Sequence, residues 1–386
     1  MSPELEWLVM AASGAAAPRE RPIDWERLAA LGEAHGLSAL LWRRLGSRNG
    51  DVPADAAELL RASGMAAEWR QKLLSCEQRS LCGLLDAERV PVLCFKGPSL
   101  AALAWEEGEL RGSTDLDLLV RREDALRAAR LLEAHAYRRV RPAPGLQAKL
   151  EAQHLHRWNE FEFISEDGLV SVDLHWAVTP PNYPFRLDLG PAWASPLELE
   201  ESGLHTLPLE TLVVALCVHG SKHLWSRLVW VCDIDRLARR FPTLDWDRVQ
   251  EIAQRSRAER ALLLGAAVSE KLLGSPMPRN LSDRVRRDTA IPSLLDQVAS
   301  SMETAGLQQT VLSEAANLKR EVLPVFDSRG DALGYVWRTL MTPKWEDWER
   351  LSLPESQTWL YRVLRPLLVA SDAARLMARR AASSRP

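Results

Sequence analysis

The chain has 386 residues, of which 46% are hydrophobic and 26% charged, and its formal net charge is −3. These values are typical of a soluble globular protein of two or three domains, and the mildly acidic balance argues against a protein that coats long nucleic acid. The five cysteines form no Cys-x-x-Cys pair, and no apolar run approaches the ~18 residues of a membrane span. We therefore expect a cytoplasmic protein with reduced thiols and no membrane contact.

Residues 1–88 are expected to be helical, because apolar residues recur there at helical spacing behind helix caps such as Asp24. The pattern changes at residues 90–95, a continuous apolar run typical of a buried strand. Gly97 and Pro98 then begin a short helix.

Two further strand signals follow in the next 80 residues. Residues 115–120 form one apolar strand, and residues 123–135 form an Ala/Leu/Arg helix behind it. Residues 158–164 alternate polar and aromatic side chains, Asp167-Gly168 supplies a turn, and residues 170–176 return as a second strand. The returning strand of this hairpin can pair beside residues 115–120.

Beyond a Pro-rich connector at residues 180–184 the chain is helical again, and a second Pro-rich joint at residues 275–278 precedes further helices. The sequence thus predicts an α+β fold, in which a small mixed sheet with helices on one side lies between helical N- and C-terminal regions. The expected division is a helical region at 1–88, a sheet core at 89–185, a helical region completing a cleft at 186–275, and a helical C-terminal region at 276–386.

Three carboxylates are expected to share one face of this sheet. Successive side chains of a strand point to opposite faces, so Asp115 and Asp117 project together, roughly 6.5–7 Å apart. The same parity places Asp173 on one face of the hairpin with Ser171 and His175. Such acids would repel one another without a cation and can grip a divalent metal, although alternating aspartates also occur on solvated edge strands.

The chain resembles the polymerase-β-like nucleotidyltransferase superfamily, whose pattern is a Gly-Gly/Ser turn, then Asp-x-Asp/Glu and a later acid. A closer resemblance rests on the stretches Phe95-Lys-Gly-Pro-Ser-Leu-Ala101, Arg111-Gly-Ser-Thr-Asp-Leu-Asp-Leu-Leu-Val120, Val172-Asp-Leu-His-Trp176 and His219-Gly-Ser-Lys-His-Leu-Trp-Ser-Arg-Leu228, with Leu353-Pro354 and Leu360-Tyr-Arg-Val-Leu-Arg-Pro366 near the C-terminus. On these stretches the chain resembles the bacterial uncharacterised nucleotidyltransferase family, and residues 89–185 are the expected catalytic core.

The resemblance implies that the three acids are both catalytic residues and metal ligands. Asp115 and Asp117 would hold Mg²⁺ or Mn²⁺ ions that orient a nucleoside triphosphate, and Asp173 would act on the acceptor side and help deprotonate the attacking hydroxyl. The chain departs from the superfamily at Pro98, which replaces the second Gly/Ser of the turn and removes a backbone N–H. Ser99 would supply a hydroxyl one position later.

Nucleotide contacts are expected at two turns. Lys96 and Gly97 end a strand at a helix N-terminus, which favours anions, although an ordinary turn with a surface lysine has the same sequence. Arg111 and Ser113 precede the acids and would face the triphosphate, with an ordinary loop arginine as the alternative.

Lys222 lies between two histidines, His219 and His223, and would contact phosphate or the acceptor; the alternative is a packed helix with satisfied histidines. The histidines are spaced like a zinc pair, but Gly220 stands where zinc proteases have glutamate and no third ligand is evident, so we do not expect zinc. Asp233 is interpreted as a capping or salt-bridge residue.

The function that the resemblance implies is transfer of a nucleoside monophosphate from a triphosphate such as ATP to a hydroxyl or phosphate, with release of pyrophosphate. The expected acceptor is a small molecule, a peptide or a protein, and not a long nucleic acid. Three alternatives stay open: a protein modifier like the small antitoxin nucleotidyltransferases, a natural-product tailoring enzyme, and a non-catalytic nucleotide-binding protein.

Overall fold

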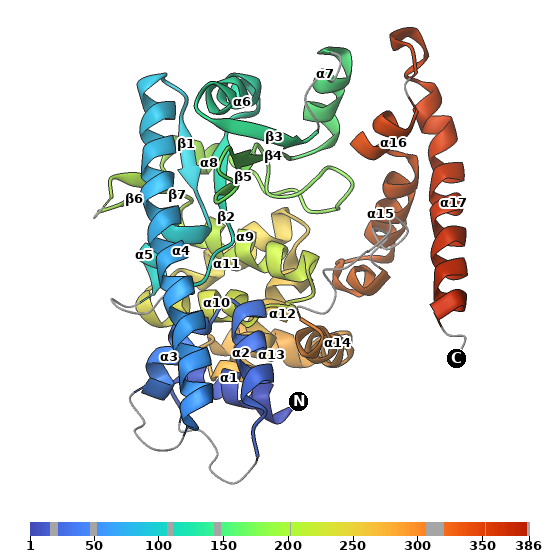
Figure 1. Cartoon of the computed structure of the whole chain (residues 1–386). Helices are drawn as coiled ribbons and strands as arrows, with labels where there is room; N and C mark the ends of the chain where they lie inside the picture. Colours follow the sequence, from blue (N-terminus) through green and yellow to red (C-terminus); the bar gives the residue numbers. More distant parts are fainter. Residues whose placement is uncertain are drawn as a thin grey trace.

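A computed structural model describes residues 1–15, 22–46, 52–105, 111–142, 148–200, 202–305, 320–351 and 353–383. It is α+β, as the sequence predicts: a small mixed sheet is surrounded by helices (Figure 1). Within these described residues, no helix combines the length and the apolar character that a membrane crossing requires. The five cysteines form no disulfide, and four of them are buried.

The N-terminal region is helical, as expected. The Asp24 side chain caps its helix by accepting from the Arg27 N–H at 3.0 Å. The longest helix of the region runs beside the sheet, with its leucines against one sheet face (Figure 1). The helices are α1 (Pro3–Ser13), α2 (Trp25–Ala34), α3 (Ser38–Gly46) and α4 (Ala54–Ala87).

The sheet has five strands in the order β1-β2-β5-β4-β3. Within this sheet β2 and β5 run parallel, and the other three neighbouring pairs are antiparallel. The predicted hairpin is formed by β4 and β5, and its second strand, β5, lies beside β2 as expected. The strands are β1 (Val92–Cys94), β2 (Asp115–Val120), β3 (Tyr137–Arg141), β4 (Glu160–Ser165) and β5 (Ser171–His175). Between them lie the helices α5 (Gly97–Ala104), α6 (Ala125–Ala134) and α7 (Ala148–Arg157) and the 3₁₀ helix η1 (Arg122–Asp124).

Helices cover both faces of the sheet, not one face as expected. Alternation along β2, β4 and β5 sends residues such as Leu116, Phe161 and Leu174 into an apolar cluster with α4 and α6. The opposite face carries the acidic side chains and looks toward α9 and α10, whose residues line a cavity with it. This arrangement leaves one polar face enclosed between layers.

The described residues beyond β5 are mainly helical and include one short hairpin, β6–β7. The elements of this part are α8 (Gly190–Ala194), β6 (Leu197–Leu199), β7 (Leu204–Thr206), α9 (Leu209–Lys222), α10 (Leu228–Arg240), α11 (Trp246–Arg255), α12 (Glu259–Leu273), α13 (Arg279–Arg287), α14 (Ile291–Glu303), η4 (Arg320–Val325), α15 (Arg329–Met341), α16 (Trp345–Arg350), η5 (Glu355–Gln357) and α17 (Leu360–Ser383).

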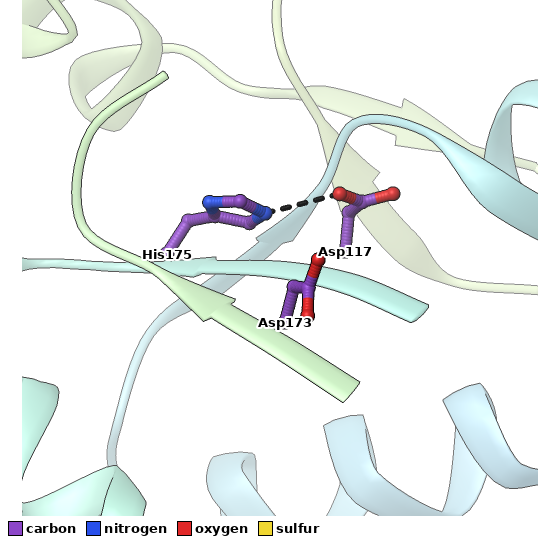
Figure 2. Close-up of side chains that lie close together, drawn as sticks. All are labelled: Asp117, Asp173 and His175. Carbon is purple, nitrogen blue, oxygen red and sulfur yellow. Dashed lines mark hydrogen bonds and ion pairs between the residues drawn. The ribbon is translucent and has the colours of Figure 1, made fainter. Parts of the chain in front are cut away.

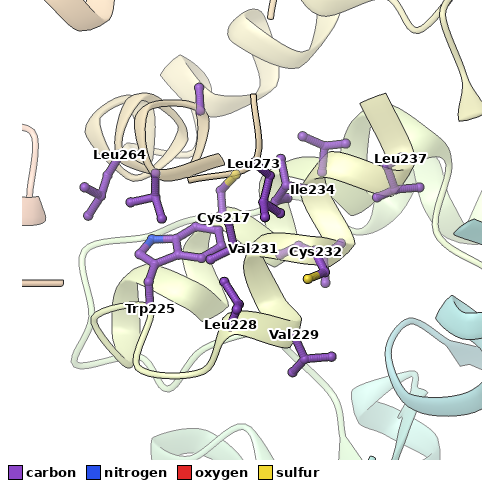
Figure 3. Packing of buried hydrophobic residues seen from close by; sticks show 14 of the residues in the cluster. Cys217, Trp225, Leu228, Val229, Val231, Cys232, Ile234, Leu237, Leu264 and Leu273 are labelled. Carbon is purple, nitrogen blue, oxygen red and sulfur yellow. The ribbon is translucent and has the colours of Figure 1, made fainter. Parts of the chain in front are cut away.

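A large apolar core extends from α1 to α15 and includes the fully buried Trp225 (Figure 3). A Cβ on Gly220 would lie 2.6 Å from the Trp225 ring, and one on Gly265 would lie 2.7 Å from Cys217 Sγ. The residue between His219 and His223 that faces Trp225 must therefore be glycine, because the indole ring occupies the space that a side chain at position 220 would need. The division into four regions stays a prediction.

A cluster of four aromatic rings joins the C-terminal region to the same core. Tyr183 and Phe185 lie against Phe326 and Tyr335, with ring centroids 4.9 to 6.3 Å apart. All four side chains are buried.

Acid should destabilise the fold through His35, which is buried and whose Nδ1 accepts from the Leu228 N–H at 2.9 Å. Burial lowers the pKa of His35 to about 4. The unfolded chain takes up this proton near pH 6.5, so it binds more protons than the folded chain between pH 6.5 and 4, and stability falls as the pH falls. We expect this group to remove about 2 kcal/mol between pH 7.5 and 5.

Urea unfolding at both pH values tests this expectation. In His35→Gln the free energy of unfolding should fall by about 2 kcal/mol less between pH 7.5 and 5 than in the parent. His205→Gln, a change at an exposed histidine, should show the pH dependence of the parent. Equal pH dependence in His35→Gln and the parent would contradict the assignment.

Candidate functional site

A cavity of about 250 Å³ lies between the polar face of the sheet and helices α9 and α10. Acidic side chains from the strands and basic side chains from the surrounding turns and helices meet in it. Its lining residues are Lys96, Gly97, Arg111, Gly112, Ser113, Thr114, Asp115, Asp117, Glu160, Asp173, His175, His219, Lys222, His223, Arg227 and Trp230.

The three predicted acids all line this cavity. The parallel pairing of β2 and β5 sets Asp117 directly beside Asp173, and Asp115 beside Ser171. One oxygen each of Asp117 and Asp173 and one ring nitrogen of His175 lie within 4.8 Å of one another, a spacing that could suit a metal ion (Figure 2). Asp115, two residues before Asp117 at the start of β2, lines the cavity outside this group of three.

Asp117 is the centre of a buried ion-pair network. Its Oδ1 lies 2.5 Å from Lys96 Nζ and 3.0 Å from His175 Nε2. His175 Nδ1 in turn lies 3.0 Å from Glu160 Oε2, and Asn159 Nδ2 donates to that same oxygen at 2.8 Å. Lys96 Nζ is also 3.5 Å from His219 Nδ1. The network extends from Lys96, at the start of α5, through β2 and β5 to β4.

These contacts fix the charges of the network. Burial raises the pKa of the Asp117 carboxyl, but Lys96 and His175 outweigh it and hold that pKa below its usual range. Burial lowers the pKa of His175, but its bonds to Asp117 and Glu160 outweigh burial and raise that pKa to about 9. Asp117, Lys96 and His175 are therefore all charged at neutral pH.

Asp173 has the opposite electrostatic environment. Burial raises the pKa of its carboxyl to about 8, and although His175 acts against this, Glu160, Asp117 and Asp115 add to it. Burial and Asp117 likewise raise the pKa of Asp115. Negative charge is thus poorly compensated on this side of the cavity, where a bound cation would relieve the repulsion.

Arg111 is held by Asp233 of α10. The sequence offered a salt bridge as one of two roles for Asp233 but did not predict its partner. Arg111 Nε and Nη2 donate to the two oxygens of Asp233 at 2.8 and 2.9 Å, and Nη1 donates to Ser113 Oγ at 2.8 Å. The Trp105 indole N–H donates to Asp233 Oδ1 at 3.0 Å. Arg111 and Ser113 therefore line the cavity in a rigid arrangement, because a bidentate pair fixes the guanidinium plane.

Of the other residues predicted to contact the nucleotide, Gly97 and Lys222 line the cavity and Ser99 does not. Gly97 has a φ of +62°. The Ser99 hydroxyl is buried and donates to Gln78 Oε1 of α4 at 2.7 Å. We therefore leave Ser99 out of the proposed phosphate contacts, because it does not line the cavity and its hydroxyl is bonded to Gln78.

His219 of α9 and His223, which follows its last residue, lie against Trp230, with ring centroids 4.9 and 5.4 Å away. Burial, with Lys96 next in effect, holds the pKa of His219 well below its ordinary value, so this ring is neutral. Among the described residues, the group that could hold a metal contains neither His219 nor His223.

Sequence reasoning missed Glu160, Arg227 and Trp230. Glu160 alternates with buried aromatic residues in β4, so the strand pattern itself placed it on the polar face with Asp173. Arg227 is part of the motif at residues 219–228, and its guanidinium lies 5.8 Å from the Trp230 ring. No signal in the sequence pointed to Trp230, which is one of fifteen tryptophans.

Comparison with known proteins identifies a matching family. A search of curated proteins finds no match for the chain. A family model described as "uncharacterised nucleotidyltransferase" matches residues 21–274, which include the whole sheet, the cavity and helices α9 to α12. Because that match covers more than half of the chain, the protein belongs to this uncharacterised nucleotidyltransferase family.

Proposed function

We propose that the chain is a metal-dependent nucleotidyltransferase, which moves a nucleoside monophosphate from a triphosphate to a hydroxyl or phosphate acceptor. The observation that carries the proposal is the clustering of Asp115, Asp117 and Asp173 in one cavity that also contains Lys96 and Arg227. A cavity with both charge signs can bind a triphosphate together with its cation, since each partner meets the opposite charge.

The residues present fit Mg²⁺ or Mn²⁺. Lys96 and His175 both bind Oδ1 of Asp117, and among the described residues no donor is bonded to Oδ2, which lies on the side away from His175 (Figure 2). Carboxylate oxygens are the ligands that these hard cations prefer. Asp117, Asp173 and Asp115 would hold the metal, which when bound neutralises and orients the triphosphate.

The chain's own cations would bind the phosphates. Lys96 lies at the N-terminal end of α5, where Gly97 and the first free N–H groups also favour an anion. Arg111 presents a fixed positive charge because Asp233 holds its plane, with the Ser113 hydroxyl beside it. Lys222 reaches the cavity from α9.

Transfer needs a proton acceptor beside the attacking hydroxyl. Asp173 is proposed for this role, because it lies directly beside Asp117 and lines the same cavity. The acceptor oxygen bonds to the α-phosphorus, its proton passes to the Asp173 carboxylate, and the bond from that phosphorus to pyrophosphate breaks. Positioning and electrostatics supply most of the rate in such reactions.

The proposed acceptor is a small molecule, a peptide or a protein in the cytoplasm. A net charge of −3 supports this choice over long nucleic acid, which favours basic surfaces.

Binding of a nucleoside triphosphate should require the metal. We expect ATP, GTP, CTP or UTP with Mg²⁺ to raise the melting temperature, since ligand at ~100 times its dissociation constant adds about 2.7 kcal/mol. Lys222→Gln should reduce the shift, whereas Ser99→Ala, measured against its own ligand-free melting temperature, should retain it. The absence of a shift with all four triphosphates at millimolar concentration would refute nucleotide binding.

A further inference from the structure

A second cavity of about 700 Å³ lies at the other end of β1 and shares no lining residue with the first. It is formed where α4, β1 and the β6–β7 hairpin lie side by side (Figure 1). Its volume falls within the range of small-molecule sites, ~300–1,000 Å³. Apolar side chains form much of its wall, among them Cys82, Val90, Val92, Leu93 and Leu204.

The charged groups of this second cavity are mainly basic. Arg79, Arg89 and Arg121 line it, against the single carboxylate of Asp86. The Arg121 guanidinium lies 4.9 Å from the Trp193 ring. Within the described part of the chain, no carboxylate forms an ion pair with any of these three arginines. Three guanidinium groups beside an apolar wall complement a ligand with an anionic group and an apolar body.

Gly83, an exposed residue of α4, contributes open space to the second cavity. It lies in the interior of α4, where glycine weakens a helix relative to alanine. A Cβ on Gly83 would meet no atom within 4 Å, so neighbouring side chains do not require glycine there. Unlike Gly220, which makes room for Trp225, Gly83 makes room only in the cavity that it lines.

We propose that the second cavity binds a small amphipathic acid, an acyl or aryl carboxylate. The apolar body would lie along Gly83 and the wall of β1, and the carboxylate would contact Arg89 and Arg121. This site is separate from the proposed nucleotide site and does not depend on it.

Calorimetric titration of the full chain with decanoate and with decyltrimethylammonium, both below their micelle concentrations, tests the proposal. The two probes share chain length and differ in charge. We expect saturable binding of decanoate at least ten times tighter than that of the cation. No saturation by decanoate in the millimolar range, or equal affinity for both probes, would overturn the proposal.

Two sets of variants locate the bound probe. Gly83→Leu, which fills the cavity with a good helix former, and the double variant Arg89→Gln/Arg121→Gln should each weaken decanoate at least tenfold. Ala66→Leu and Arg70→Gln change exposed positions of α4 outside the cavity and should bind like the parent. Gly83→Leu should melt at or above the parent temperature. Unchanged decanoate binding in both cavity variants would place the probe elsewhere and reject the site.

Discussion

Replacement of Asp117 by asparagine should lower nucleotide transfer on the order of 10²–10³-fold, because it removes a carboxylate from the proposed metal and triphosphate site. It should also destabilise the protein. The acid cluster taken alone suggests that removing one negative charge is neutral or favourable. The structure reverses that expectation, since Asp117 is the shared anion of the buried Lys96 and His175. Breaking such a pair costs up to about 3–5 kcal/mol.

Asp115→Asn is the matched control. Among the described residues, the Asp115 carboxylate accepts a hydrogen bond only from Thr114 Oγ1, at 3.3 Å, and burial disfavours its charge. This variant should also lose transfer, but with little change in stability or a small gain. Urea unfolding beside a labelled-triphosphate transfer assay measures both quantities. Normal transfer by Asp117→Asn would reject the metal site, and equal stability losses in the two variants would reject the role given to Lys96.

Asp233→Ala should be among the most destabilising substitutions in the chain. It leaves the buried Arg111 guanidinium without a counterion and the Trp105 indole N–H without its acceptor. An uncompensated buried charge costs about 3–5 kcal/mol. Nucleotide affinity should fall as well, because Arg111 would lose its fixed orientation.

A double variant separates these two effects. Arg111→Met/Asp233→Leu replaces the ion pair by apolar groups and should recover most of the stability. It should not recover triphosphate binding, because the positive charge is gone. Melting of Asp233→Ala at the parent temperature, or full nucleotide binding by the double variant, would contradict the role assigned to Arg111.

The local pattern of the sequence was sufficient to place the acids. Strand parity put Asp115 and Asp117 on one face and Asp173 on the matching face of the hairpin, and strand pairing then fixed their proximity. The same parity argument extends to Glu160, which faces His175 across β4 and β5. Alternation along a strand shows which side chains share a face, and it can be read from a few consecutive residues.

Strand periodicity could not predict hydrogen-bond or salt-bridge partners that are far apart in the sequence. Arg111 and Asp233 are 122 residues apart, and their contact depends on how α10 lies against the start of β2. The position of Ser99 depends on α4, whose Gln78 takes its hydroxyl. Strand β3 was not predicted, because its arginine-rich sequence at Tyr137–Arg141 lacks a regular apolar alternation. Such charges are common on edge strands, which β3 is.

The contact of Tyr183 and Phe185 with Phe326 and Tyr335 bears on how this family can diversify. The matched stretch ends at residue 274, yet two of these four rings come from beyond that limit. A relative with a different C-terminal part must therefore cover Tyr183 and Phe185 with other apolar side chains or replace them by polar ones. We therefore expect substitutions at these four positions to be coupled across residue 274.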